Sequence, residues 1–116
     1  MKTLELRRTY RKREITARIT TLDGGVEILL YGGDYPHIGA VGILTPENRL
    51  TVTEFPGHRE GILCQQWLEA LSNAHILPAT VAAGIHYDCL DPAGISDVLK
   101  LTEDMLRDAV LFCAST

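Results

Sequence analysis

Residues 15–31 read ITARITTLDGGVEILLY, two apolar segments joined by an Asp-Gly-Gly turn. Ile15, Ala17 and Ile19 alternate with polar residues, which is typical of a strand that is buried on one face. The Asp-Gly dipeptide is a common hairpin turn, so the second segment is expected to return as an antiparallel strand. Because the alternation begins further upstream, we expect the first strand to extend over residues 3–20 without a break.

The segments that follow predict more strands and then two helices. Turn residues bound two further strands, at 38–44 and 49–55. The hydrophobic period then changes to about 3.6 residues over 59–75, which indicates an amphipathic helix. A run of small apolar residues at 79–87 is typical of a strand in a sheet interior. Ser96 is the expected N-cap of a C-terminal helix.

The predicted order of elements is therefore ββββαβα. This order favours an α+β fold, a mostly antiparallel sheet with two helices packed on one face. With 116 residues the chain has room for one hydrophobic core and not for two, so we expect a single domain over residues 1–116. Apolar residues make up 46% and charged residues 22% of the chain, as in ordinary globular proteins.

The apolar runs and the cysteines indicate the cellular compartment of the protein. No apolar run approaches the roughly 20 residues that cross a bilayer, and the first twenty positions are charged throughout. The three cysteines are widely spaced among apolar neighbours, with no CxxC pattern. We therefore expect a cytoplasmic protein with buried free thiols and no membrane partner.

The charge is unevenly distributed along the chain. The net charge of −4 argues against a nucleic-acid partner, because such binding depends on clustered Lys and Arg. The N-terminal region nevertheless carries a basic strip, made of Arg7, Arg8, Arg11, Lys12 and Arg13. This strip can either hold one phosphate or protect an exposed edge strand against aggregation.

Two glycine-flanked loops contain the candidate site. The segment GGDYPHIG places Asp34 close to His37, and the segment FPGHREG places His58 close to Glu60. Imidazole nitrogens and carboxylate oxygens bind divalent metals, so these groups can form a metal site if the loops converge. Otherwise the histidines are hydrogen-bonding loop residues. His86, near the end of a predicted strand, can point to the same end of the sheet or be structural.

Other features are weaker or point away from catalysis. The turn before the first helix is expected to expose backbone N–H groups, which suits a phosphate. The small residues at 39–42 lack the GxGxxG pattern of a dinucleotide site, so they make room for a flat ligand or for a close neighbouring strand. No serine or cysteine has the context of a nucleophile.

Trp67 lies on the apolar helical stripe and is expected in the core, and His75 is expected to be structural.

Taken together, the segments Gly33–Val41 and Gly57–Glu60 resemble the paired motifs of LpdD-like proteins, which are encoded beside UbiD-type decarboxylases. The resemblance covers nearly the full chain and implies a fold similar to that of proteasome assembly chaperones. It implies a non-catalytic accessory protein that binds prenylated FMN, or FMN, with the help of a divalent metal ion. It also implies delivery of the cofactor to, or maturation of, a UbiD-type decarboxylase, and a homodimer.

The resemblance suggests which residues bind the metal. It implies His37 and His58 as the first ligands, followed by Glu60 and Asp34, and the position of His86 adds a fifth candidate.

For the flavin, the chemistry of the ligand agrees with the residues present. A flavin is planar and apolar and has an anionic tail, so it suits an aromatic contact, a surface of small residues and cationic anchors. The candidate flavin-binding residues are Tyr35, Gly39, Arg59 and Arg11.

Two other functions stay open on the sequence. One is a small metal-dependent hydrolase or lyase, with His37 and His58 as ligands and Glu60 as the general base. The other is a structural assembly chaperone in which the histidine cluster is incidental. Catalytic turnover would distinguish the first from a carrier, and a failure to bind any cofactor would indicate the second.

Overall fold

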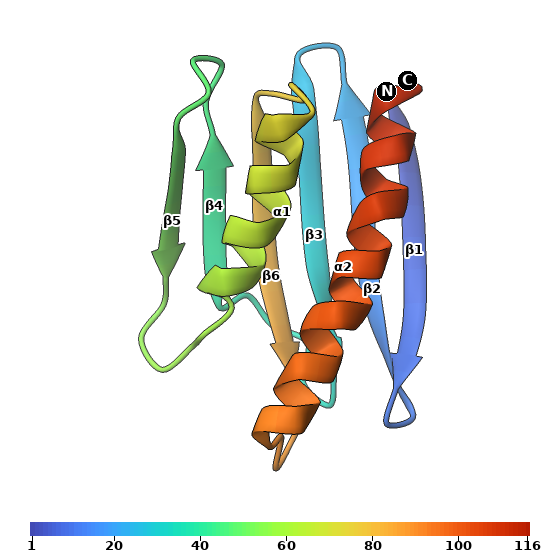
Figure 1. Ribbon diagram of the computed structural model, residues 1–116, viewed down its shortest axis with the longest axis vertical. Helices are drawn as coiled ribbons and strands as arrows, with labels where there is room; N and C mark the ends of the chain where they lie inside the picture. The colour runs from blue at the N-terminus through green and yellow to red at the C-terminus, as the bar shows by residue number, and fades with distance from the viewer.

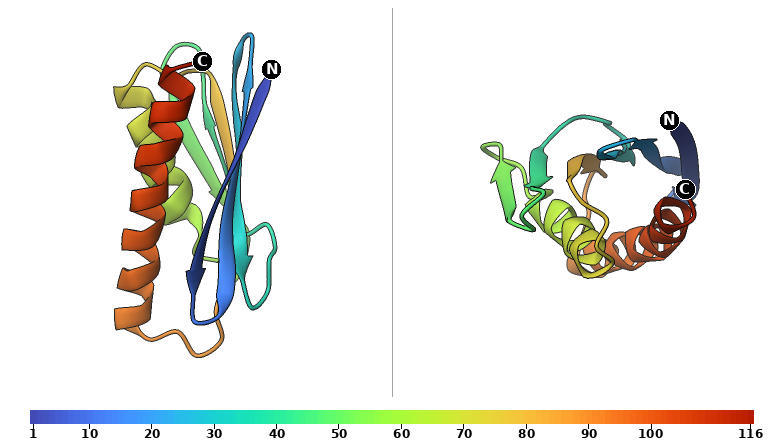
Figure 2. Two further views of the ribbon diagram at one scale, coloured as in Figure 1. Left: turned by 90° about the vertical axis from the view of Figure 1, so that its right-hand side faces the viewer. Right: turned by 90° about the horizontal axis from the view of Figure 1, so that it is seen from above.

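The structure, a computed structural model that describes residues 1–116, contains one six-stranded sheet and two helices. The elements in chain order are β1 (Lys2–Tyr10), β2 (Arg13–Leu22), β3 (Gly25–Gly33), β4 (Ala40–Leu44), β5 (Leu50–Glu54), α1 (Gly61–Asn73), β6 (Ala79–His86) and α2 (Pro92–Ala114). Both helices lie on the same face of the sheet (Figures 1 and 2). The predicted α+β class is therefore confirmed.

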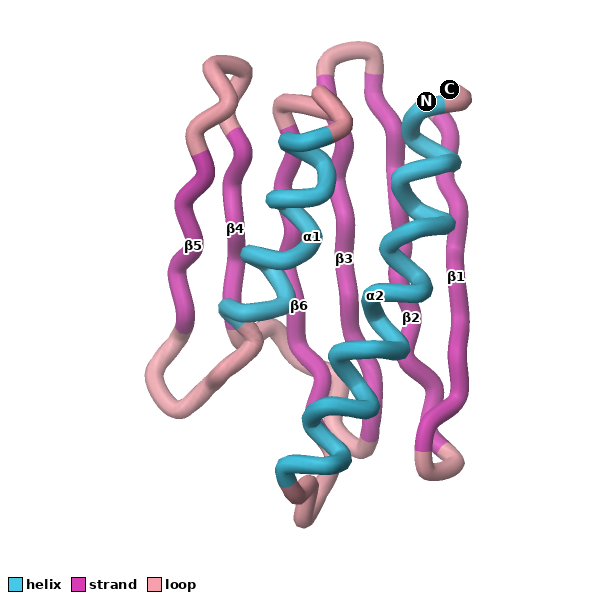
Figure 3. Tube along the Cα trace, in the orientation of Figure 1, coloured by secondary structure: helices cyan, strands magenta, loops and turns pink.

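The strands are arranged in the order β1-β2-β3-β6-β4-β5. Strand β6 lies between β3 and β4, pairing parallel with β3 and antiparallel with β4, and all other pairs are antiparallel. The small apolar residues of β6 had predicted this interior position. Strands β3, β5 and β6 run in the same direction, so the loops that follow them all emerge at one end of the sheet (Figure 3).

The prediction of one strand over residues 3–20 is wrong, because this segment forms the hairpin of β1 and β2. Arg11 and Lys12 make the turn with φ values of 48° and 65°. Five strands therefore precede the first helix instead of four. The turn was missed because such positive φ values normally select glycine or asparagine, and an Arg-Lys dipeptide carries no turn signal.

The predicted start of the C-terminal helix is also wrong. Helix α2 begins at Pro92 with Asp91 as its N-cap, and the Asp91 side chain accepts a 2.8 Å hydrogen bond from the Gly94 N–H. Proline at the first helical position is well tolerated, because its missing N–H would have no partner there. Ser96 consequently lies inside the helix.

The core fills the space between the sheet and the two helices. Ile15, Ala17 and Ile19 point into it from β2, and Trp67 is fully buried there, as predicted. On the other face the sheet is not covered by any helix (Figure 2). No helix is long and apolar enough to cross a bilayer.

The cysteines differ from one another in their surroundings. All three are free, but only Cys64 is buried, Cys113 is partly buried and Cys89 is exposed. The prediction of buried thiols is therefore wrong for Cys89, which lies in the loop after β6. Burial raises the pKa of the Cys64 thiol to about 11, so this side chain stays protonated and packs as a small apolar group.

The basic strip lies on β1, an edge strand, on the turn that follows it and at the first residue of β2. Its arginines pair with carboxylates of β1 itself, of α2 and its N-cap, and of the loop after β3. The pairs are Arg7 with Glu5, Arg8 with Asp104 and Asp108, Arg11 with Asp91, and Arg13 with Asp34. The strip thus connects the edge of the sheet to α2 and to the loop after β3.

We expect Leu30→Ala to lower the free energy of unfolding by about 2–5 kcal/mol, because Leu30 is fully buried and truncation leaves a cavity. Urea unfolding followed by circular dichroism measures the change. Leu111→Ala is the matched control: this leucine is 68% exposed, so its truncation should change stability by less than about 0.5 kcal/mol. Equal effects of the two substitutions would contradict the assigned core.

Candidate functional site

The candidate site lies at the end of the sheet where three loops meet. The loop from β3 to β4 carries His37, the loop from β5 to α1 carries His58 and Glu60, and the loop from β6 to α2 begins after His86. All three loops lie at the lower end of the molecule in Figure 1. The predicted convergence of the two motifs is therefore observed.

His37, His58 and Glu60 form a compact cluster, here called the His-His-Glu triad. The donor atoms lie within 4.8 Å of one another. His37 Nε2 is 2.7 Å from Glu60 Oε1 and 3.1 Å from His58 Nδ1, and His58 Nδ1 is 3.7 Å from Glu60 Oε2. The side chains of His37 and Glu60 are only 11% and 10% exposed, whereas that of His58 is 37% exposed. The triad is thus open to solvent mainly on the His58 side.

The backbone fixes the tautomer of His37. His37 Nδ1 is 2.9 Å from the carbonyl oxygen of Tyr35, which can only accept, so Nδ1–H donates this hydrogen bond. In a neutral ring, Nε2 then presents a lone pair to the Glu60 carboxylate at 2.7 Å. Two acceptors at that distance repel each other unless a cation lies between them. The triad therefore requires either a proton or a metal ion, and the carbonyl-held imidazole is typical of metal-bound histidine.

Gly39 makes room for the Glu60 carboxylate. A Cβ atom at position 39 would lie 2.2 Å from Glu60 Oε2. The same oxygen accepts a 3.0 Å hydrogen bond from the Arg59 N–H, which orients the carboxylate toward the histidines. The structure thus places Gly39 beneath a triad residue, a role that the sequence did not indicate.

Gly84 of β6 has a comparable role for the other loop. A Cβ atom there would lie 1.6 Å from the His37 carbonyl oxygen, so only glycine allows this loop to lie against the sheet. At Gly42 a Cβ would meet the side chain of Leu68 at 2.5 Å. Of the two interpretations of the small residues, close packing of neighbours describes these positions, and a flat open platform does not.

Three backbone amides around the start of α1 are already paired. The N–H of Arg59 donates to Glu60, that of Gly61 donates to Glu54 Oε2 at 3.0 Å, and that of His58 donates to the Phe55 carbonyl. The prediction that this helix N-terminus exposes free N–H groups to a phosphate is therefore wrong for these three amides. An anion at this end of the molecule needs another source of positive charge.

Asp34 and His86 lie near the triad without joining it. Asp34 accepts a 3.0 Å hydrogen bond from the Asp88 N–H and pairs with Arg13 at 3.2 Å. His86 Nε2 is 2.9 Å from Asp88 Oδ1. Both residues line an open hollow of about 520 Å³ together with His37 and His58, here called the polar hollow.

The other predicted flavin contacts are placed differently from one another. Tyr35 is exposed and lines the polar hollow, with its ring centre 5.6 Å from that of His37. Arg59 is an exposed residue next to Glu60. Arg11 lies away from the triad, 3.8 Å from Asp91 at the start of α2. The structure therefore brings Tyr35 and Arg59 to the site and leaves Arg11 outside the polar hollow.

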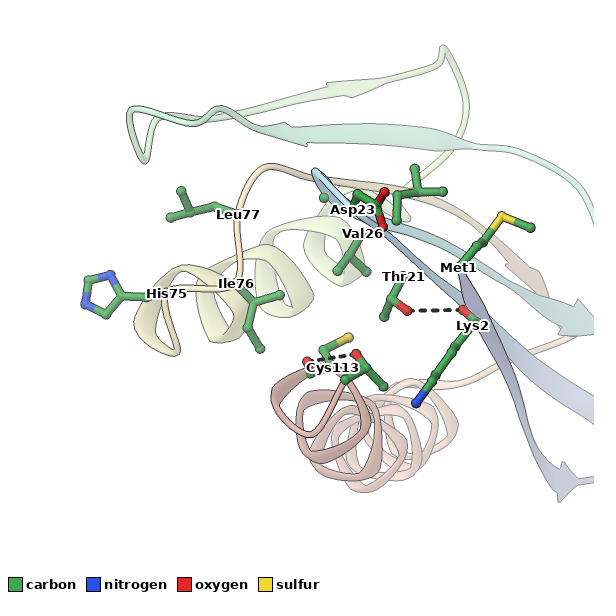
Figure 4. A pocket seen from close by; sticks show the side chains of 12 residues that line it. Met1, Lys2, Thr21, Asp23, Val26, His75, Ile76, Leu77 and Cys113 are labelled. Carbon is green, nitrogen blue, oxygen red and sulfur yellow. Dashed lines mark hydrogen bonds between the residues drawn. The ribbon is translucent and has the colours of Figure 1, made fainter.

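A further cavity of about 500 Å³ lies at the opposite end of the molecule, near both chain termini. It is lined by residues such as Lys2, Thr21 and Cys113 and by none of the predicted site residues (Figure 4). Its single imidazole, that of His75, points away from the other labelled side chains. This cavity contains no cluster of possible metal ligands.

Comparison with known proteins agrees with this geometry. The profile of the prenylated flavin chaperone LpdD-like domain matches residues 9–112. The chain belongs to the prenylated flavin chaperone LpdD-like family. Protein LpdD of Lactiplantibacillus plantarum is 26% identical over 88 residues, which cover 72% of this chain and 65% of the relative. The chain thus spans about two thirds of the length of that LpdD protein, and the resemblance seen in the sequence motifs is confirmed.

Sequence reasoning found the three triad residues but missed two supports of this LpdD-like site. The Tyr35 carbonyl is a backbone atom and carries no residue-type signal. Gly84 lies in a run of small apolar residues, where one glycine cannot be distinguished from a packing alanine before the loop over it is known.

We expect Gly39→Ala to weaken divalent metal binding by about 10-fold to 100-fold while the protein still folds, because Glu60 can move away from the added methyl group. Calorimetric titration with Zn²⁺ measures the affinity. Gly24→Ala is the matched control, since a Cβ atom at position 24 meets nothing within 4 Å. Wild-type affinity in Gly39→Ala would show that this contact does not position Glu60.

The second expectation concerns the carboxyl group of Asp34. The hydrogen bond from the Asp88 N–H, followed by the contact with Arg13, holds the pKa of Asp34 below its usual value of 3.8. Arg13→Gln should raise this pKa, because it removes a hydrogen bond and a positive charge that favour the ionised carboxyl. The side-chain ¹³C shift measured against pH tests this, with Arg7→Gln as a control that should leave the Asp34 pKa unchanged.

The direction of the stability effect follows from the lowered pKa. Because the folded state favours the ionised carboxyl, Asp34 stabilises the fold above the usual pKa of 3.8, and this contribution is lost as the pH falls through the folded value. Thermal melting of the wild-type protein and Asp34→Asn should therefore differ most near neutral pH and converge in acid. A difference that persists unchanged in acid would contradict the assignment.

Proposed function

We propose that this protein is a non-catalytic carrier that binds prenylated FMN through a divalent metal ion held by His37, His58 and Glu60. It then delivers the cofactor to a UbiD-type decarboxylase or assists the maturation of that enzyme. The observation that carries the proposal is the convergence of His37, His58 and Glu60, whose donor atoms lie within 4.8 Å of one another and can hold a divalent metal ion. Membership of the LpdD-like family supports the choice of cargo.

The donor set fits a divalent metal ion. Two imidazole nitrogens and one carboxylate are a common ligand set for zinc, and they leave one coordination position open. In a tetrahedral site with bonds of about 2.0–2.1 Å, neighbouring donor atoms lie about 3.3 Å apart. The two imidazole nitrogens of the triad lie 3.1 Å apart, close to that value, and the Glu60 carboxylate approaches His37 through Oε1 and His58 through Oε2. A bound ion would supply the positive charge that the capped amides before α1 cannot supply to a phosphate.

The chain's own residues would orient the cofactor around this ion. His58 is the most exposed triad member, so a ligand would approach a bound ion from the His58 side. Tyr35 and Arg59 are exposed beside the triad and offer an aromatic and a cationic contact. Asp34 and His86 hold their loops through Asp88 and remain candidates for contacts further from the ion.

The role assigned to Glu60 supports a carrier over a metal-dependent hydrolase. A hydrolase needs a carboxylate that is free to accept a proton from metal-bound water. Glu60 instead contacts His37 directly and is held by the Arg59 N–H, which suits a ligand. The neighbouring carboxylates of Asp34 and Asp88 are engaged with Arg13 and His86.

Further parts of the proposal concern assembly and place. We propose a cytoplasmic homodimer, and the uncovered face of the sheet offers space for such contacts. Similarity of the fold to proteasome assembly chaperones stays a prediction from the motif resemblance.

A titration with prenylated FMN, followed by flavin fluorescence, tests the proposal with and without Zn²⁺ or Mn²⁺. We expect binding to require the metal and to be abolished by a chelator. His37→Ala should lose the metal-dependent binding, because it removes one ligand of the triad. His75→Asn is the matched control: His75 lies far from the triad, and asparagine tolerates its φ of 56°.

Metal-independent binding, or equal losses in the two histidine variants, would contradict the proposed site. Incubation of the metal-loaded protein with ester and phosphoester substrates tests the alternative activity. If the protein turns over a substrate many times, and this activity depends on His37 and His58, the protein is a hydrolase and the carrier proposal is wrong.

A further inference from the structure

A second hollow, the interhelical cleft, lies between the first turns of the two helices. It has a volume of about 510 Å³, and eight of its 13 lining residues are hydrophobic. Ile62 and Leu63 of α1 line one side, and Ile95, Val98 and Leu99 of α2 line the other. The cleft is therefore an apolar groove, in contrast to the polar hollow, where only one of seven lining residues is hydrophobic.

Two large apolar side chains stand at opposite sides of this cleft. Ile62 is 58% exposed and Ile95 is 44% exposed, so neither contributes its full side chain to the core. Both lie in the first turns of their helices. A pair of exposed isoleucines facing one groove is typical of a surface that buries an apolar ligand.

The interhelical cleft and the polar hollow share a wall. Gly57, His58 and His86 line both of them, and Glu60 lines the cleft as well. His58 therefore separates an apolar space from a polar one, with the triad at the boundary. A single ligand that is apolar at one end and anionic at the other can extend across this wall.

We propose that the interhelical cleft receives the fused-ring body of the ligand, while the anionic end of the ligand reaches the triad at His58. The volume of the cleft lies within the usual range of about 300–1,000 Å³ for small-molecule sites. The sheet offers no equivalent surface near the triad, because Gly39 is covered by Glu60 and Gly84 by the His37 backbone. The choice of prenylated FMN as the ligand rests on the proposed function.

The double variant Ile62→Ser/Ile95→Ser tests the cleft without adding charge. With Zn²⁺ present, we expect its dissociation constant for prenylated FMN to rise about tenfold, because apolar contact on both sides of the ring is lost. Zn²⁺ binding itself should be unchanged by calorimetry, since no triad residue is altered. Leu111→Ser is the matched control, as Leu111 is an exposed residue of α2 that does not line the cleft.

A second variant, Ile95→Trp, tests the same inference by filling the cleft, and it should also weaken the binding of prenylated FMN. Circular dichroism melting confirms that each variant folds. If the variants bind prenylated FMN as the wild type does while His37→Ala does not, the inference is overturned and the proposed function stands.

The proposed function fails separately if the wild-type protein does not bind prenylated FMN at all. The cleft is then tested with 8-anilinonaphthalene-1-sulfonate, an aromatic anion whose fluorescence rises in apolar sites. Loss of this signal in the double variant but not in Leu111→Ser supports the cleft as a site for aromatic anions. Equal signals in all variants overturn it.

Discussion

The contact between His37 Nε2 and Glu60 Oε1 imposes the constraint on which the site depends. The Tyr35 carbonyl accepts a hydrogen bond from His37 Nδ1–H, so in a neutral ring the Nε2 lone pair faces a carboxylate oxygen at 2.7 Å. A proton or a metal ion between them makes this arrangement favourable. His37 and Glu60 lie in different loops, and the difference between positions 60 and 37 is 23 residues. A cation held here therefore also ties the loop after β3 to the start of α1.

The sheet order is what brings these loops together. Strand β6 enters between β3 and β4, so the chain between those two strands must cross over the end of β6. That crossing carries His37, and the absence of a side chain at Gly84 lets it lie against β6. The result is a site whose geometry is set by buried backbone, with solvent access mainly at His58.

The sequence predicted the composition of the site better than its boundaries. His37, His58 and Glu60 were identifiable because they lie beside glycines between periodic segments, where a polar cluster has no packing role. The Arg11-Lys12 turn was not, because both strands of its hairpin keep the same alternation and neither residue signals a positive φ. The interhelical cleft could not be predicted either. Hydrophobic periodicity places its lining residues on a face of α1 or of α2, but it does not show that the two faces lie next to each other.

The electrostatics of this end of the molecule suggest an order of binding for a carrier. Glu54 and Glu60 each accept from one amide at the start of α1, and Asp34 and Asp88 line the polar hollow, so carboxylates outnumber arginines at this end of the molecule. A divalent ion in the triad would reverse that local charge and leave one coordination position for an oxygen of the cofactor. Binding of the cofactor would thus be coupled to the metal. Release of the cofactor would require the loss of that one coordination bond and of the apolar contacts in the open cleft. Contacts with a partner protein would replace them. Such weak anchoring suits a protein that transfers its ligand.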